Sequence, residues 1–319
     1  MTRLLGRLPG PGREVKVAPG LGEDAAAIRI GSRTLVWATD PVSLASDRIG
    51  WYAVQINAND VATMGARPKW FQACLCLPSQ RGGPTPEKIF DDIALACREL
   101  KVSVVGGHTE VTAGLTDPLI MGTMAGLTPP GRNPIPTAGA KAGDAVVMVG
   151  SGGLEAAAII AREHHARLKG RVSEQVIRRA ARLLFKPGIS VVAPALSALR
   201  FGPHAMHDPT EGGILAGLWE MAAAAKKGVQ ADRWAIPILP EVEQVCSAVG
   251  VDPLRCLASG SLLIALPKEN ASRLIKSYHR RGLPAAVIAH IQATPVGLFE
   301  HSTGKPLHPS PRDELSKLS

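Results

Sequence analysis

The stretch Asn57-Ala58-Asn59-Asp60-Val61-Ala62-Thr63-Met64-Gly65-Ala66 lies in the helix around which the first half of the chain is predicted to fold. Residues 49–64 carry apolar side chains at helical spacing, and the helix is expected to end at Gly65. Asp60 is a carboxylate among these apolar neighbours and is therefore predicted to be buried. A buried carboxylate is costly unless a cation or hydrogen-bond donors compensate it. The stretch thus indicates a cation site.

Two further acids lie at the edges of predicted strands. Asp24 follows a glycine-rich turn and precedes a strand at residues 25–30, and Asp40 ends a strand at residues 34–40. Each acid alone has a structural alternative, as a turn residue, a strand terminator or a polar helix position. Mg²⁺ prefers oxygen ligands from a few carboxylates together with phosphates and water. If Asp24, Asp40 and Asp60 converged on one point, they would suit a Mg²⁺ ion.

Length and composition narrow the class of protein. A chain of 319 residues with 45% hydrophobic residues can form about two domains. The 36 Lys and Arg exceed the 27 Asp and Glu, but they are scattered, and only 4% of residues are aromatic, so we expect no nucleic-acid partner. No apolar run reaches the length of a membrane helix. The five cysteines form no CxxC motif, which favours reduced thiols and a cytoplasmic protein.

The order of elements predicts an α/β (α+β) protein with two domains. Residues 1–20 are expected to be a flexible glycine-rich leader and residues 21–135 an N-terminal domain. A proline- and glycine-rich boundary then leads to a C-terminal domain at residues 140–300, and residues 301–319 are expected to be a disordered tail. Further strands are predicted at residues 70–77, 102–105, 119–127, 145–149 and 260–266, and further helices at 85–101, 154–168, 173–184, 212–226 and 271–281.

Two more polar clusters border predicted elements. Gly106-Gly107-His108-Thr109-Glu110 follows the strand at residues 102–105, and His108 is a candidate proton donor, although a single loop histidine is more often structural. Residues 206–213, Met-His-Asp-Pro-Thr-Glu-Gly-Gly, open a helix for which Asp208 or Thr210 is the expected N-cap. The functional alternative is an acidic loop facing a nucleotide or substrate. No GxxxxGK[ST] motif occurs, so a P-loop does not hold any nucleotide.

Taken in order, these clusters resemble the aminoimidazole ribonucleotide synthetase-related, PurM-like superfamily. The resemblance covers the chain to about residue 300, and its most specific part is the Asn-Asp-x-Ala-x-Met-Gly-Ala pattern at residues 59–66. It implies a two-domain PurM-like fold, a homodimer formed through the N-terminal sheets, and Mg²⁺ and ATP as cofactors, with Asp24, Asp40 and Asp60 as the metal ligands. It also implies two sets of site residues. The implied catalytic residues are His108, Glu110, Asp208, Thr210 and Glu211, and the implied nucleotide-binding residues are Asn57, Asn59, Gly106, Gly107, Thr109, Gly212 and Gly213.

Among the members of this superfamily the sequence is most similar to HypE-like hydrogenase maturation factors. Those proteins end in a cysteine that carries the reacting group, whereas here no cysteine follows Cys256. We therefore expect an ATP-dependent, Mg²⁺-requiring kinase or synthetase-type enzyme that phosphorylates a small anionic substrate. The alternatives are a HypE-like maturation factor acting on a cysteine of a partner protein, and a non-catalytic ATP-binding homologue.

Overall fold

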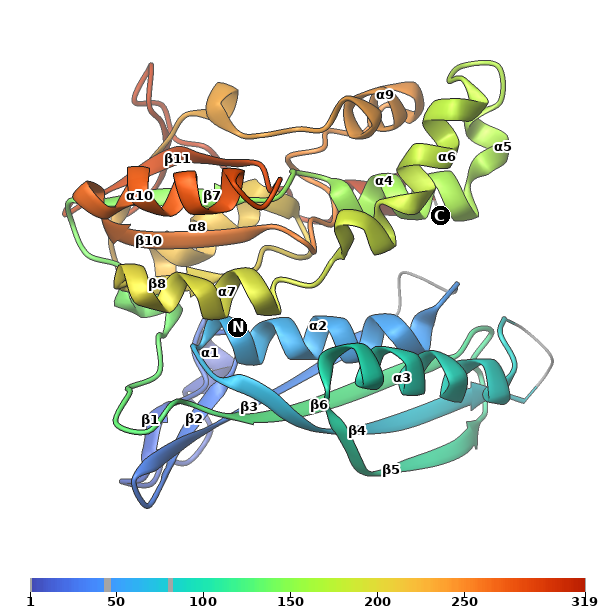
Figure 1. Ribbon diagram of the computed structural model, residues 1–319, viewed down its shortest axis with the longest axis horizontal. Coiled ribbons are helices and arrows are strands. Elements are labelled where there is room, and N and C mark those ends of the chain that lie inside the picture. Colours follow the sequence, from blue (N-terminus) through green and yellow to red (C-terminus); the bar gives the residue numbers. More distant parts are fainter. Residues whose placement is uncertain (1, 43–46, 80–82, 319) are drawn as a thin grey trace. The chain divides into compact units, whose positions relative to one another are not determined.

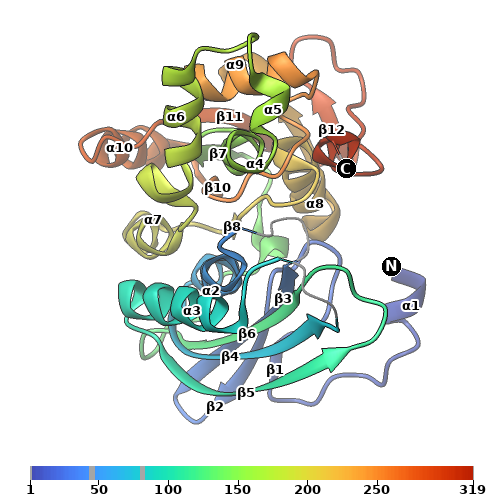
Figure 2. The same ribbon diagram turned by 90° about the vertical axis from the view of Figure 1, so that its right-hand side faces the viewer.

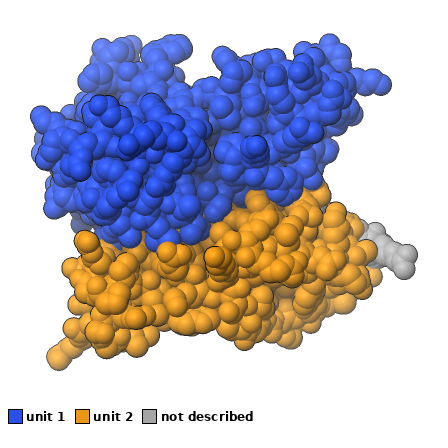
Figure 3. Space-filling model, viewed as in Figure 1, with its two compact units in different colours: residues 1–9, 19–24, 135–319 blue, residues 10–18, 25–134 orange. Residues whose placement is uncertain are grey.

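The computed structural model describes residues 2–42, 47–79 and 83–318. The chain forms two compact units, which Figure 3 distinguishes by colour. The N-terminal unit consists of residues 10–18 and 25–134, and the C-terminal unit consists of residues 1–9, 19–24 and 135–319. Part of the predicted leader is therefore built into each unit. The two-domain α/β class predicted from the sequence is confirmed.

The N-terminal unit is a six-stranded sheet in the order β1-β2-β3-β6-β4-β5 (Figure 1). All neighbouring strands run antiparallel except β4 and β5, which are parallel. Two helices, α2 and α3, lie side by side on one face of the sheet, as Figures 1 and 2 both show. The bounds are β1 Val15–Val17, β2 Ala26–Ile30, β3 Arg33–Val42, α2 Ile49–Thr63, β4 Arg67–Pro78, α3 Pro86–Leu100, β5 Ser103–Thr112 and β6 Leu119–Leu127.

Helix α2 packs closely on the sheet because two residues of β6 have no side chain. A Cβ atom at Gly122 would meet the side chain of Asn57, and one at Gly126 would come within 2.6 Å of Val61. Almost every residue of α2 is buried, including the polar side chains of Gln55, Asn57 and Asn59. The predicted burial of Asp60 is confirmed, since the residue is only 4% exposed.

The C-terminal unit contains a second six-stranded sheet, in the order β12-β9-β11-β7-β10-β8. Only β12 and β9 are parallel. Figure 1 shows α10 in front of these strands and α8 behind them, and α8 buries its apolar face in the main core. The bounds are β7 Asp144–Val149, α4 Leu154–Glu163, α5 His165–Leu168, α6 Glu174–Arg182, α7 Val192–Ala198, β8 Ala205–His207, α8 Gly213–Ala225, β9 Gly228–Ala231, α9 Pro240–Val249, β10 Leu262–Pro267, α10 Lys268–His279, β11 Ala285–Gln292 and β12 Gly297–Glu300.

Some predicted elements differ from the observed ones. The strand expected at residues 102–105 continues to Thr112, so the polar cluster that was expected in a loop lies inside β5. The helix expected at residues 154–168 ends at Glu163 and resumes as α5. Among the described residues, no single helix has the length and apolar composition to cross a membrane; the bent pair Glu174–Gly188 and Val192–Phe201 meets those two criteria together.

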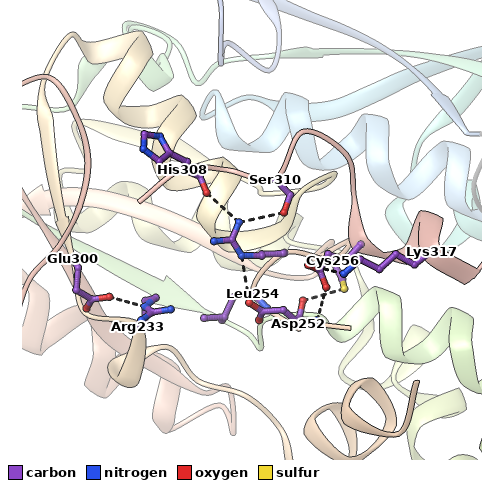
Figure 4. A network of polar contacts seen from close by, with 10 residues as sticks. Arg233, Asp252, Leu254, Cys256, Glu300, His308, Ser310 and Lys317 are labelled. Carbon is purple, nitrogen blue, oxygen red and sulfur yellow. Dashed lines mark hydrogen bonds and ion pairs between the residues drawn. The ribbon is translucent and has the colours of Figure 1, made fainter. Parts of the chain in front are cut away.

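The C-terminal segment is ordered against its unit, contrary to the disorder expected for residues 301–319. Glu314 accepts a hydrogen bond from the backbone of Asp252 at 2.8 Å, and Arg255 donates to the carbonyl oxygen of His308 at 3.0 Å. Figure 4 shows His308 and Ser310 of this segment beside Asp252 and Cys256. The prediction of disorder was wrong because polar contacts to backbone groups hold most of the segment. Such contacts produce no apolar periodicity in the sequence.

Helix α4 carries a buried acid close to this segment. Glu155 accepts a hydrogen bond from the backbone of Ser259 at 3.2 Å. Burial raises the pKa of Glu155 from 4.5 to about 7, an effect that the hydrogen bonds from Ser259 only partly offset. The folded protein therefore retains a proton at this carboxyl group at pH values where the unfolded chain has lost it.

Replacing Glu155 with Gln should flatten the pH dependence of stability. Between pH 4.5 and about 7 the folded state binds the extra proton, so the wild-type free energy of unfolding should fall as pH rises, by up to about 1.4 kcal/mol per pH unit. Chemical denaturation across this range measures that slope. The slope should persist in a Glu243→Gln control, which alters an exposed acid of α9. An unchanged slope in Glu155→Gln would contradict the assignment.

Candidate functional site

Asn57 joins α2 to the end of strand β3. Its side-chain oxygen accepts a hydrogen bond from the backbone N–H of Asp40 at 2.9 Å, and its amide nitrogen donates to the carbonyl oxygens of Asp40 at 3.3 Å and Ala53 at 2.9 Å. These bonds fix Asp40 next to the helix that carries Asp60, one turn beyond Asn57. The structure thus brings two predicted metal ligands to neighbouring positions in the N-terminal unit, and it gives Asn57 a structural role that the sequence did not reveal.

The backbone of α2 is tightly held at the acid. Thr63 donates its hydroxyl to the carbonyl oxygen of Asp60 at 2.7 Å, within the last turn of the helix. Asn59 is fully buried. The carboxylates of Asp40 and Asp60 are the hard oxygen donors that Mg²⁺ prefers. The chemistry of these side chains therefore fits the predicted ion.

The polar cluster at residues 106–110 lies elsewhere in the same unit. It belongs to β5, which is the edge strand of the sheet, and strands β6 and β4 separate it from β3. His108 and Glu110 are both exposed, with 3.6 Å between the histidine Nε2 and the carboxylate Oε2. A Cβ atom at Gly107 would meet the backbone oxygen of Ala73, so this glycine permits close pairing with β4. The structure does not bring this cluster together with Asp40; its predicted catalytic and nucleotide-binding roles, including that of Thr109, stay predictions.

The C-terminal unit presents the loop between β8 and α8. Asp208 is buried, Thr210 is half-buried and Glu211 is exposed. The N-cap of α8 is Gly212, with a φ angle of 76°, so the expected cap at Asp208 or Thr210 was wrong. A Cβ atom at Gly213 would come within 2.6 Å of the backbone oxygen of Cys256, which explains the second glycine.

The first turn of α8 is occupied by a carboxylate from the same chain. The backbone N–H of Gly212, a predicted nucleotide contact, donates to Asp313 Oδ2 at 2.8 Å. Asp313 also accepts from the backbone of Leu315 at 2.8 Å. Burial raises the pKa of Asp313, an effect that these backbone hydrogen bonds counter. No sequence pattern indicates this contact, because residues 212 and 313 are 101 residues apart in the chain.

His207, at the end of β8, lies between two carboxylates. Its Nδ1 is 2.5 Å from Asp24 Oδ1 and its Nε2 is 3.0 Å from Glu220 Oε2. Burial alone would lower the pKa of His207, but the two carboxylates outweigh it and hold the pKa well above its usual value. His207 is therefore a buried imidazolium. No role for His207 is predicted from the sequence, because His204 and His207 are not spaced with a third residue as metal ligands would be.

The segment that carries Asp24 is bound to the C-terminal unit at two further points. Glu23 accepts hydrogen bonds from the backbone of Thr137 at 3.0 Å and of Ala138 at 2.9 Å. A Cβ atom at Gly22 would come within 2.9 Å of the backbone oxygen of Glu220. These contacts define the position of the Asp24 carboxylate within its unit.

The predicted metal ligands are thus divided between the units. Asp40 and Asp60 belong to the N-terminal unit, whereas Asp24 belongs to the C-terminal unit. In the described part of the chain, no three His, Cys, Asp or Glu side chains are grouped so that they could hold a metal ion. The joint ligand set stays a prediction.

Both halves of the chain match domain models of the same protein family. The model of the AIR synthase related protein N-terminal domain matches residues 22–128, and that of the C-terminal domain matches residues 141–300. A carbamoyl dehydratase HypE of Rhizobium leguminosarum bv. viciae is 30% identical over 283 residues, which cover 85% of this chain and 77% of that protein.

Solved structures share the fold. A ThiL structure described as AaThiL complexed with AMPPCP and TMP has a TM-score of 0.73 and 22% identity, covering 91% of this chain and 90% of that one. The hydrogenase maturation protein HypE in complex with ATP has a TM-score of 0.69 and 23% identity, with coverages of 93% and 92%. From the match of both domain models and the HypE relative, the chain belongs to the AIR synthase-related protein family.

Proposed function

We propose that this protein is a Mg²⁺-dependent enzyme that uses ATP to phosphorylate, and so activate, an acceptor group. The observation that carries the proposal is the arrangement of Asp60, buried on an apolar helix, beside Asp40, whose backbone Asn57 holds in place. Similar proteins have been crystallised with ATP and with AMPPCP, which supports a nucleotide as the other ligand. Phosphoryl transfer needs positioning and charge neutralisation more than covalent help from the protein.

The two carboxylates of Asp40 and Asp60 in the N-terminal unit would hold the metal. Asp24, the third predicted ligand, belongs to the C-terminal unit and stays a prediction. When bound, Mg²⁺ would neutralise charge on the phosphates and orient them. The chain's own contribution is to hold the carboxylates in place.

His207 is the residue that performs this task for Asp24. The imidazole Nδ1 of His207 lies 2.5 Å from Asp24 Oδ1, and this contact orients the carboxylate. The second carboxylate, Glu220, keeps the imidazole protonated from its other side. We therefore assign His207 as a positioning residue for the proposed metal ligand.

The acceptor in this proposal is a small anionic molecule bound near the loop of Asp208, Thr210 and Glu211. The observed segment at residues 301–318 contains no cysteine and is bound to its own unit through Asp313 and Glu314. These residues therefore supply no thiol acceptor.

The predicted homodimer has a supporting surface in the N-terminal unit. Val104, Val105 and Val111 of the edge strand β5 are each more than half exposed, as is Phe90 of α3. A strand edge with exposed apolar side chains is suited to pairing with another chain. We propose that this surface forms the contact between two copies.

A second candidate is a HypE-like reaction on the cysteine of a partner protein. The observation in its favour is the 30% identity to a carbamoyl dehydratase HypE over most of both chains. Steady-state release of ADP or AMP distinguishes the two candidates. The first expects turnover with small anionic metabolites alone, whereas the second expects turnover only after a carbamoyl-transferring protein and its cysteine-bearing acceptor are added.

Asp60→Asn should abolish stabilisation of the protein by Mg-ATP. The substitution keeps the size of the side chain but removes the charge that holds the metal. Thermal unfolding with and without saturating Mg-ATP measures the effect, and the exposed Asp91 of α3 provides a matched Asp91→Asn control. The wild type and control should show the same increase in melting temperature. An undiminished increase in Asp60→Asn would refute the assigned role.

His207→Ala should destabilise the C-terminal unit strongly. The change removes the buried imidazole that contacts both the Asp24 and the Glu220 carboxylates, at a cost of about 3 kcal/mol or more. His204→Ala is the matched control, because His204 also contacts a carboxylate, that of Asp144 at 3.0 Å, but its side chain is 26% exposed. Its loss should cost about 1 kcal/mol. Chemical denaturation measures the free energy of unfolding of both variants. If both lose the same amount, His207 contributes no more to stability than the partly exposed His204.

A further inference from the structure

A hollow of about 750 Å³ lies between α10 and the short helix at Leu199–Phe201 in the C-terminal unit. Figure 2 shows α10 at the margin of this unit. Four of its lining side chains are cationic at neutral pH, and no carboxylate lines it among the described residues. None of the lining residues is a predicted site residue. The hollow is lined by Arg200, Phe201, Arg273, Lys276, His279 and Arg280.

Two of the cations, Arg273 and Lys276, lie on α10, and a third, Arg280, is its C-cap residue. Arg273, Lys276 and Arg280 are spaced three and four residues apart, which places them in one row along the helix surface. Like charges at this spacing repel one another. Within the described residues, no ion pair joins any of the three to an acid. The row therefore lacks an internal counter-charge.

The helix dipole explains only part of this arrangement. Lys276 and His279 lie in the last turn of α10, where a cation is favoured by the helix C-terminus. His279 is also used structurally, since its Nε2 is 2.9 Å from the backbone oxygen of Ala285. Arg273 lies a turn earlier, and Arg200 comes from a different helix. The helix dipole therefore does not explain why Arg273 and Arg200 line the same hollow as Lys276.

Arg200 is held in place before any ligand arrives. Its guanidinium lies 4.8 Å from the ring centroid of Phe201, and its Nη2 donates to Ser277 Oγ at 2.6 Å. A guanidinium carries five N–H donors in a planar fork that matches phosphate oxygens. Stacking and one hydrogen bond fix the plane of this fork, which reduces the ordering cost of binding.

We propose that this hollow binds a small polyphosphate anion, such as pyrophosphate or the phosphates of a nucleotide, without a metal ion. Two phosphate groups carry about three to four negative charges, which matches the four cations. The concave shape suits a small ligand. An extended nucleic acid fits less well, because Arg200 already covers Phe201, the aromatic ring that lines the hollow. The inference does not depend on the proposed function.

No carboxylate lines the hollow among the described residues, so anion binding there should not require Mg²⁺. This independence from Mg²⁺ distinguishes the hollow from a Mg-ATP site. Isothermal titration with pyrophosphate in EDTA, at constant ionic strength, should show one saturable site in the wild type and in Asp60→Asn. The double variant Arg273→Gln/Lys276→Gln should bind at least about tenfold more weakly, because two of four charge-assisted contacts are lost. Arg200→Lys should also bind more weakly, since it keeps the charge but loses the stacked fork.

The matched control is Arg178→Gln/Arg179→Gln, which removes two exposed arginines of α6 and changes the net charge equally. It should bind pyrophosphate with an affinity within about twofold of the wild type, since screened surface charge alone contributes little at constant salt. The proposal is overturned by equal weakening in both double variants, by binding that requires Mg²⁺, or by no saturable binding. The hollow would instead be a nucleic-acid site if a single-stranded RNA oligonucleotide bound more tightly than pyrophosphate and this binding depended on Arg273 and Lys276.

Discussion

The close packing of α2 on β6 is the constraint on which the N-terminal unit depends. It is possible only because Gly122 and Gly126 leave room for Asn57 and Val61. A helix held at this distance has no freedom to rotate, so the direction of every α2 side chain is fixed by the sheet beneath it. Asn57 uses that rigidity to hold Asp40, and Asp60 shares it one turn later. A buried acid can serve as a reliable ligand when its scaffold does not move.

The C-terminal unit combines close backbone contacts, at Gly22 and Gly213, with buried charge. His207 between Asp24 and Glu220 forms a compact group of alternating charge, and Asp313 supplies a carboxylate to the first turn of α8. Each of these contacts joins residues that are distant in sequence or that belong to different elements. Their directional hydrogen bonds specify one arrangement of the β8–α8 loop, which apolar packing alone would leave less well defined.

The sequence predicted the fold class, the α2 helix and the burial of Asp60 because these follow from local periodicity and from the family pattern at residues 59–66. It did not predict the contact of His207 with Asp24 or that of Asp313 with Gly212, because these pairs are 183 and 101 residues apart in the chain. It placed His108 in a loop because glycine pairs usually interrupt strands, whereas Gly107 here allows β5 to continue against β4. Strands β9, β11 and β12 were missed because their positions depend on pairing with one another.

The chain alternates between the two units before it reaches residue 25. Residues 1–9 and 19–24 belong to one unit, and residues 10–18 belong to the other. Neither unit is therefore a contiguous piece of polypeptide, and a cut at residue 134 would separate Asp24 from His207. During synthesis, the first residues of the C-terminal unit emerge long before their partners, so this unit cannot complete its fold until more than 180 further residues have followed Asp24. All residues of the N-terminal unit, by contrast, have been synthesised by residue 134.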